Sequence, residues 1–451
     1  MNSNELSFSH RRGPYLVRPL GALEEFLWLL DQSRPTHFVM AAQVRGSTTL
    51  SDWCRALDCV QARHPLLSVR IARNQEDRPC FYHERTTSIP FRVVQGTNAT
   101  QRWESEAELE LSIPFDPTSA PLVRAVLLHE EQTAVCLLTA HHSIADGRSI
   151  AFVIRDLLSV VSGKPVDRLP LLSSVEDILG VTSTDISYPS SEPPASPERP
   201  AVFVTKEDTR PRIKSLSLTS QLTSRLRQRA RQEGTTVHGA LSSAFALAFW
   251  EVVDDLSASP VRIMSPIDAR KLLSLGEDCG VLVASGSVII EPSEATDFWE
   301  IARSATNRLG KAQTLEAIKA VRYSMHQLMK QGLDVSTVAT LAAGGYAHDI
   351  ILTNLGPLGY QTDFSELRLE AVWGPAFSAR LLDAHAIGVA TTNGSIRLLQ
   401  ATFAPLGSLL ETVEKILGAA CATRKAVMAS PPNRLIRTSK IDNPSDFLSQ
   451  E

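Results

Sequence analysis

Apolar residues recur at helical spacing in three stretches of the first half of the chain. Between Leu20 and Leu30 they stand three or four positions apart, as on the buried face of a helix. The same spacing runs through 51–62 and stops before a histidine–proline pair, where a helix usually ends. It returns at 150–161 and stops before Gly163. The pattern therefore predicts three helices.

Two runs rich in β-branched and aliphatic residues lie directly before the third helix. Residues 121–129 (PLVRAVLLH) and 133–140 (TAVCLLTA) predict a hairpin around the polar turn at 130–132. The second run continues without a break into the polar stretch 141–147 (HHSIADG). This stretch is therefore predicted to form the loop between a buried strand and the start of a helix.

Strands and helices also alternate in the second half. A helix is predicted over 219–233, ending at Gly234, followed by a nearly all-apolar buried helix that ends near Val253. A further helix is predicted over 297–313. Predicted strands cover 261–266, 280–290, 349–353 and 384–390. This alternation favours an α/β or α+β architecture.

One shift in composition divides the chain. Residues 186–200 read ISYPSSEPPASPERP, and such a density of proline sustains neither a helix nor the interior of a sheet. We therefore predict an N-terminal lobe over 1–185, a linker over 186–205, a C-terminal lobe over 206–428 and a tail over 429–451.

Length and charge restrict the class of protein. The 451 residues include 45 basic and 49 acidic side chains, a net charge of −4 that gives no footprint for general nucleic-acid binding. The longest apolar stretch is too short to cross a bilayer, and no secretory signal is evident. The six cysteines have no Cys-x-x-Cys spacing and are interpreted as small buried residues in a reducing compartment. A soluble cytoplasmic protein is expected.

The loop 141–147 is the dense polar cluster at a strand-to-helix junction. A histidine held there by rigid backbone titrates near neutrality and can accept a proton from an alcohol or amine. Asp146 can cap the following helix or pair with a cation, and Gly147 lets the backbone turn. Two plainer interpretations stay open at this point: the histidines are core residues, and Asp146 is a helix cap and nothing more.

The sequence His141-His142-x-x-x-Asp146-Gly147 resembles the motif of the chloramphenicol-acetyltransferase-like superfamily, which includes condensation domains and alcohol acyltransferases. Companion stretches resemble the polyketide-associated and alcohol O-acyltransferase branch and follow in family order over about residues 18–405. They are Arg18-Pro19-Leu20-Gly21 through Glu24, Arg63-His64-Pro65-Leu66-Leu67, Phe115-Asp116 through Arg124, Pro266-Ile267-Asp268-Ala269-Arg270 and Thr353-Asn354-Leu355-Gly356.

This resemblance implies a fold and a set of roles. Two similar lobes would form a V-shaped pseudo-dimer with a tunnel through the cleft and His142 at its middle. His142 would be the general base, whereas His141 would shape the loop by packing. Asp146 would form a structural ion pair, by position with Arg270, for which the plainer interpretation is a surface cation beside Asp268. An N–H near Gly147, or the segment Thr353-Asn354, would stabilise the oxyanion.

Other signals were weighed against these. Zinc binding by His141, His142 and Asp146 is disfavoured because neighbouring strand residues point to opposite faces, so we predict no metal. The nucleotide-binding glycine motifs and the serine elbow are absent from the sequence. The arginines at 225, 227, 229 and 231 favour a solvated helix face over a phosphate or carrier site. Trp373, Pro375 and Phe377 suit either an acyl tunnel or ordinary packing.

The sequence thus predicts an enzyme that moves an acyl group from a thioester to an alcohol. The donor would be acyl-coenzyme A or an acyl group on the phosphopantetheine arm of an acyl carrier protein, with no permanently bound cofactor. The alternatives are a free-standing condensation enzyme that forms an amide with an amine acceptor, and a non-catalytic docking relative. A monomer suffices, because two lobes supply both walls of one cleft.

Overall fold

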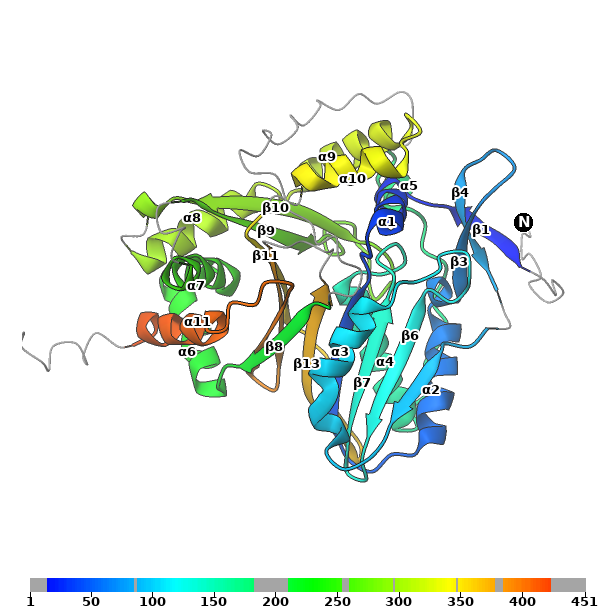
Figure 1. Cartoon of the computed structure of the whole chain (residues 1–451), viewed down its shortest axis with the longest axis horizontal. Helices are drawn as coiled ribbons and strands as arrows, with labels where there is room; N and C mark the ends of the chain where they lie inside the picture. The colour runs from blue at the N-terminus through cyan, green and yellow to red at the C-terminus, as the bar shows by residue number, and fades with distance from the viewer. Residues whose placement is uncertain are drawn as a thin grey trace, which may run out of the picture.

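The computed structural model describes residues 14–84, 87–181, 210–253, 259–294, 297–345, 348–377 and 384–422. Within these ranges the structure has two sheets of six strands and one of three (Figure 1). The predicted linker at 186–205 and the predicted tail at 429–451 lie outside the described residues.

The first large sheet has the strand order β12-β13-β2-β7-β6-β5. Its strands are β2 (Phe38–Arg45), β5 (Phe91–Val94), β6 (Val123–His129), β7 (Thr133–Ala140), β12 (Asp363–Phe364) and β13 (Leu367–Phe377). The helices of this half are α1 (Ala22–Ser33), α2 (Leu50–Arg63), α3 (Trp103–Ser112), α4 (Gly147–Val161) and α5 (Val175–Leu179). Side chains of β2 and β7 alternate between a core with α2 and α4 on one face and a core with α3 on the other.

The second large sheet has the order β10-β9-β11-β14-β15-β8, with parallel and antiparallel neighbours. Its strands are β8 (Arg212–Ser217), β9 (Val261–Asp268), β10 (Val283–Ile290), β11 (Ile350–Pro357), β14 (His385–Thr392) and β15 (Ser395–Thr402). One face packs on α6 (Ser220–Gln232), α7 (Val237–Val252), α8 (Phe298–Gly310) and α11 (Leu409–Ala420). As predicted, α7 is buried along most of its length.

The smaller sheet has the order β1-β4-β3, with β1 (Tyr15–Pro19), β3 (Val69–Arg73) and β4 (Pro79–His83). Two helices of the second half, α9 (Leu315–Met329) and α10 (Val335–Gly345), cross over and pack on α1 of the first half. No helix in the described ranges is both long and apolar enough to span a bilayer.

Strand β13 joins the two halves of the chain. It comes late in the sequence but pairs with β2 of the first sheet, and it crosses β14 of the second. At the crossing, a Cβ on Gly388 would lie 2.3 Å from the carbonyl oxygen of Pro375, so only glycine fits there. Trp373 is buried at this junction and stacks on Trp103 of α3 with ring centroids 5.5 Å apart. For Trp373 the structure therefore bears out the packing interpretation.

The open edge of β8 is covered by side chains of the other half. Glu108 of α3 accepts the backbone N–H of Ile213 at 2.8 Å, and Glu104 accepts that of Ser215 at 3.0 Å. These glutamates stand one helical turn apart and take the place of a further strand. The second half of the chain thus gives β12 and β13 to the sheet of the first half, and α3 of the first half covers the edge of β8.

The cysteine interpretation needs one correction. Cys80, Cys136, Cys279 and Cys421 are buried and none of the six is in a disulfide, but Cys59 is only half-buried and Cys54 is exposed. Cys54 follows the buried Trp53 on α2, and one step along a helix turns a side chain toward solvent.

Candidate active site

The motif loop lies where the sequence predicted it, between a buried strand and a helix. Strand β7 ends at Ala140, and α4 begins at Gly147. The backbone N–H of His141 donates to Leu122 O at 3.0 Å, which continues the ladder between β6 and β7 by one residue. The N–H of Ile144 then donates to His141 O at 3.2 Å, so the chain turns at once. The loop is short and held at both ends.

The His142 ring is oriented by the loop that carries it. Its Nδ1 lies 3.0 Å from Ala145 O. Because a carbonyl oxygen can only accept, Nδ1 carries the proton and Nε2 presents a free lone pair. The Phe38 ring packs against the imidazole with centroids 5.0 Å apart, and the residue is partly exposed. Burial of the ring lowers the pKa of His142 below its ordinary value, although the charge of Asp146 opposes this effect. The imidazole is therefore neutral at pH 7, the form that a general base requires.

His141 has the opposite environment. It is fully buried, and its Nδ1 lies 3.1 Å from the backbone nitrogen of Ser143 and 2.7 Å from the Ser143 hydroxyl. Its Nε2 is 3.3 Å from a carboxylate oxygen of Asp31. Adjacent histidines thus face different ways, as expected at the end of a strand.

Asp146 performs both of the tasks that the sequence left open. Its Oδ1 accepts the backbone N–H of Ser149 at 2.7 Å and caps α4. Its two carboxylate oxygens also accept from the guanidinium of Arg270, each at 3.0 Å. The residues are 1% and 4% exposed, so Arg270 is not a surface cation. Burial alone would raise the pKa of Asp146, but the charge and hydrogen bonds of Arg270 outweigh it and lower that pKa.

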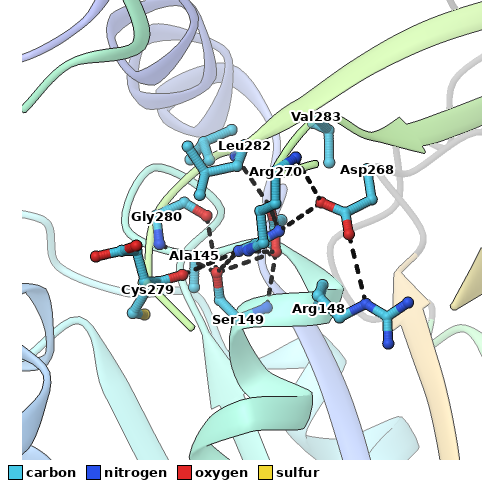
Figure 2. A network of polar contacts seen from close by, with 12 residues as sticks. Ala145, Arg148, Ser149, Asp268, Arg270, Cys279, Gly280, Leu282 and Val283 are labelled. Carbon is cyan, nitrogen blue, oxygen red and sulfur yellow. Dashed lines mark hydrogen bonds and ion pairs between the residues drawn. The ribbon is translucent and has the colours of Figure 1, made fainter. Parts of the chain in front are cut away.

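The pair extends into a network that joins the two halves of the chain (Figure 2). Arg270 also donates to Asp268 at 2.9 Å and to the Ser149 hydroxyl at 2.7 Å. The Leu282 N–H donates to Asp146 at 2.9 Å, and the Ser149 hydroxyl bonds both backbone groups of Gly280. Sequence reasoning missed Ser149; its one signal was a short polar side chain in the first turn after a capping aspartate.

Gly147 is needed for space rather than for an unusual backbone angle. A Cβ on this residue would lie 2.9 Å from Cγ of Pro375 and 3.3 Å from Leu355. Its φ is not in the positive range that favours glycine. The expected backbone freedom is therefore not the reason for glycine here; the reason is the close approach of β13 to the start of α4.

Thr353 and Asn354 lie on β11, paired with Gly388 and Val389 of β14. The Asn354 side-chain oxygen accepts the N–H of Gly356 at 2.8 Å. The next residue, Leu355, contacts α4, because Arg148 donates to its carbonyl oxygen at 2.7 Å. The structure thus brings the end of β11 against the helix that follows the motif loop. The assignment of Thr353 or Asn354 to an oxyanion stays a prediction.

Two of the companion stretches form polar contacts that are largely buried. Arg18 binds both carboxylate oxygens of Glu24, at 2.7 and 2.8 Å. Arg124 binds Glu110 and covers the ring of Phe115 at 4.3 Å. These stretches therefore hold the scaffold together.

The stretch Arg63-His64 reaches α4. Arg63 donates to Asp156 at 2.6 Å, and His64 Nε2 lies 2.9 Å from the same carboxylate oxygen. Asp156 stands on α4, almost three turns after Asp146, so this stretch secures the helix that begins at the motif.

Two further signals can be placed. In the described part of the chain no cluster of three or more histidine, cysteine or acidic side chains could hold a metal ion. On α6, Arg225, Arg227 and Arg231 are exposed, while Arg229 pairs with Glu233 at 2.7 Å and lies over the Trp299 ring.

Family models match both halves of the chain. The condensation domain model matches residues 22–174. The model described as phthiocerol/phthiodiolone dimycocerosyl transferase C-terminus matches residues 207–384. The first match contains the motif loop, and the second contains Arg270 and the Thr353-Asn354 segment.

Curated relatives match over part of their length. Malpibaldin synthetase of Mortierella alpina is 30% identical over 159 residues, which are 34% of this chain and 3% of that protein. One component of the linear gramicidin synthase of Brevibacillus parabrevis is 23% identical over 276 residues, 54% of this chain and 5% of that protein. The chain therefore spans only a few per cent of the length of these relatives.

Solved structures match over almost the whole fold. Polyketide synthase associated protein 5 of Mycobacterium tuberculosis has a TM-score of 0.63 at 18% identity, covering 91% of this chain and 99% of that one. The trichothecene 15-O-acetyltransferase of Fusarium sporotrichioides has a TM-score of 0.65 at 13% identity, covering 91% and 96%. The predicted two-lobed α+β fold is confirmed by these likenesses, whereas the tunnel stays a prediction.

Proposed function

We propose, since the chain belongs to the chloramphenicol-acetyltransferase-like condensation superfamily, that it moves an acyl group from a thioester to a hydroxyl group. Membership of this superfamily makes the protein a transferase of the acyl-transfer and condensation type, associated with natural-product synthesis. The ester product and the residue roles are the parts that we propose.

The observation that carries the proposal is the contact between His142 Nδ1 and the carbonyl oxygen of Ala145, which fixes the proton on Nδ1. The His142 Nδ1–H is bound to Ala145 O at 3.0 Å, so Nε2 is free to accept a proton. In the proposed reaction, Nε2 removes the proton of the acceptor hydroxyl as the oxygen attacks the thioester carbonyl carbon. The C–O bond forms, the tetrahedral intermediate collapses, and the C–S bond breaks. The leaving sulfur takes the proton back from His142, so the enzyme returns to its starting state.

The other residues of the site would position the motif loop or stabilise the negative charge that develops on the substrate. Asp146 is fully engaged with Arg270, Ser149 and Leu282, so it would hold the loop without taking part in proton transfer. The developing oxyanion needs a donor, and we assign this task to the Gly147 end of α4 or to Thr353 and Asn354. Thr353 and Asn354 are both partly exposed, which suits a substrate contact.

The donor class follows from the chemistry. A thioester is already activated, so no resident cofactor is required. Acyl-coenzyme A and the acylated phosphopantetheine arm of a carrier protein present the same thioester, and both remain candidates. The name of one similar protein, a trichothecene 15-O-acetyltransferase, supports the hydroxyl acceptor.

Amide formation is the second candidate. Its support is the match of the condensation domain model over residues 22–174 and the likeness to peptide synthetases such as linear gramicidin synthase. The same Nε2 would then remove a proton from an attacking amine. A non-catalytic docking role is disfavoured because the motif is intact and the His142 Nε2 is left free by its loop.

The proposal is tested by following thiol release from the purified chain. A panel of acyl-coenzyme A and acyl-carrier thioesters is combined with alcohols and with amines, and products are identified by mass. We expect acceptor-dependent thiol release with formation of an ester, slowed by about 10²–10⁴-fold in His142→Ala. Amide products would favour the second candidate, and release no faster than with His142→Ala across the panel would contradict both.

A further inference from the structure

A second buried carboxylate touches the motif loop, on a residue given no role above. Asp31 lies near the end of α1 and is 9% exposed, and its Oδ2 is 3.3 Å from Nε2 of the fully buried His141. Its Oδ1 accepts the backbone N–H of Thr36 at 2.7 Å and the Thr36 hydroxyl at 3.1 Å. Asp31 therefore connects the α1–β2 turn to the motif.

The hydrogen-bond donors around His141 fix its proton. The backbone N–H of Ser143 can only donate, and it points at Nδ1 from 3.1 Å. Nδ1 must therefore be the acceptor, which leaves the proton on Nε2. This nitrogen is 3.3 Å from the Asp31 carboxylate, in a close charge contact without full hydrogen-bond alignment. Burial alone would raise the pKa of Asp31, but contacts with His141 and Thr36 outweigh it and lower that pKa, so the carboxylate is ionised.

We infer that Asp31 is a positioning residue, which holds His141 in its Nε2–H form so that His141 Nδ1 fixes the turn carrying His142. The turn is short: Ser143 N–H binds His141 Nδ1, Ile144 N–H binds His141 O, and Ala145 O receives the His142 Nδ1–H. A change of proton position on His141 therefore shifts the carbonyl that orients His142. This inference rests on the proposed function of His142 and deepens it.

The Asp31→Asn variant tests the idea with almost no change in shape. In wild type, Oδ1 accepts two donors from Thr36 and Oδ2 faces the His141 Nε2–H. Asparagine has one oxygen. If that oxygen serves Thr36, the amide NH2 meets Nε2–H as donor against donor. If the proton of His141 moves to Nδ1 instead, Nδ1–H and the Ser143 N–H become two donors facing each other. Either outcome breaks a contact of the loop.

We expect Asp31→Asn to lower kcat by about 10- to 100-fold with little change in KM, since small displacements of a catalytic group have effects of this size. A double-mutant cycle identifies the route. If Asp31 acts through His141, Asp31→Asn adds no further loss to His141→Ala, whereas independent effects would multiply. Glu110→Gln is the matched control: its carboxylate is also buried, but it binds Arg92, Arg124 and Thr139 and not the motif loop, so the variant should keep kcat near wild type.

Nitrogen NMR of histidine-labelled protein gives a readout that needs no activity. Wild type should show His141 as the Nε2–H form and His142 as the Nδ1–H form, and Asp31→Asn should mix the forms of His142. A kcat within twofold of wild type, multiplying effects in the cycle, or wild-type His141 protonated on Nδ1 would overturn the inference. If wild type transfers no acyl group while the NMR result is as expected, the proposed function fails and the positioning geometry stands.

Discussion

The loop over 269–282 of the second half is held on α4 at two places that differ in their surroundings. At the first turn, Arg270 binds the Asp146 carboxylate, with side chains 4% and 1% exposed. Two turns later, Glu277 of the same loop binds Arg155, with side chains 43% and 17% exposed. This loop is therefore tied to α4 by one ion pair in the buried interior and by another that is much more exposed.

Loss of the buried ion pair and loss of the exposed one should have different effects on the free energy of unfolding. A buried ion pair contributes little net free energy over apolar residues, but losing one partner strands a charge without water. A pair at the surface is hydrated and screened, and its loss costs little. The inner contact therefore fixes geometry beside His142, while the outer one only helps retain the loop.

The largest expected effect is that of Arg270→Ala. It leaves Asp146 buried without its cation, and breaking such a pair costs about 3–5 kcal/mol of the free energy of unfolding. Asp146→Ala should be destabilising as well, and both should lower the rate. Chemical denaturation with a constant m-value measures the change. A variant as stable as wild type would show that the inner contact does not hold the loop.

Lowering the pH should reduce the loss of unfolding free energy caused by Arg270→Ala. In wild type the pKa of Asp146 lies below its unfolded value of about 3.9, so its stabilisation is complete above that pH and is lost as pH falls through the lowered pKa. In the variant, burial without Arg270 raises this pKa, and the penalty is relieved as the carboxyl protonates. The difference in unfolding free energy should narrow steadily from about pH 7 to about pH 3.

Other titrations cancel in this difference. Burial lowers the pKa of His37 and of His238 to about 4, and both residues keep the same surroundings in the two proteins. If the difference in unfolding free energy between wild type and Arg270→Ala stays constant with pH, Arg270 does not affect the pKa of Asp146.

The start of α4, next to the buried ion pair, should not accommodate a larger side chain at position 147. Gly147→Ala places a methyl group 2.9 Å from Pro375, and overpacking of this kind costs about 1–3 kcal/mol. Gly310→Ala at the end of α8 is the control, since nothing lies within 4 Å of a Cβ there and alanine favours helix. Melting temperatures should move in opposite directions. If Gly147→Ala stabilises the protein, β13 can move away from the added methyl group at little cost.

The smallest effect is expected at the outer contact. Glu277→Gln leaves Arg155 bound to Asp156 at 2.8 Å, so its cost should stay below about 1 kcal/mol. This cost should shrink further in 1 M salt, at a Debye length of about 3 Å, whereas that of Arg270→Ala should not. Equal salt dependence of the two variants would remove the distinction between inner and outer contacts.

The sequence predicted local elements well because their signals are local. The helix expected over 150–161 is observed over Gly147–Val161, extended at its start by the cap on Asp146. The hairpin before the motif has its predicted second strand unchanged, at Thr133–Ala140. The pairing of Asp146 with Arg270, across 124 positions, came from resemblance to a family, since no spacing rule could supply it.

The pattern of apolar and polar residues along the chain could not predict contacts between segments that are far apart in sequence. Nothing in residues 367–377 indicates that β13 enters the sheet of the other half. Nothing in the sequence around Glu104 and Glu108 indicates that these side chains cover the edge of β8. No role was predicted for Asp31 from the sequence, because its partner His141 lies 110 positions away in sequence (141 minus 31) and meets it only in the folded protein.

The most direct test of the account is the turnover number of His142→Ala in acyl transfer, measured on protein shown to be folded by its melting temperature. A positioned general base contributes about 10²–10⁴-fold, and we expect a loss of that size with the fold retained. Turnover equal to wild type by the folded variant would contradict the assignment of His142 as the base.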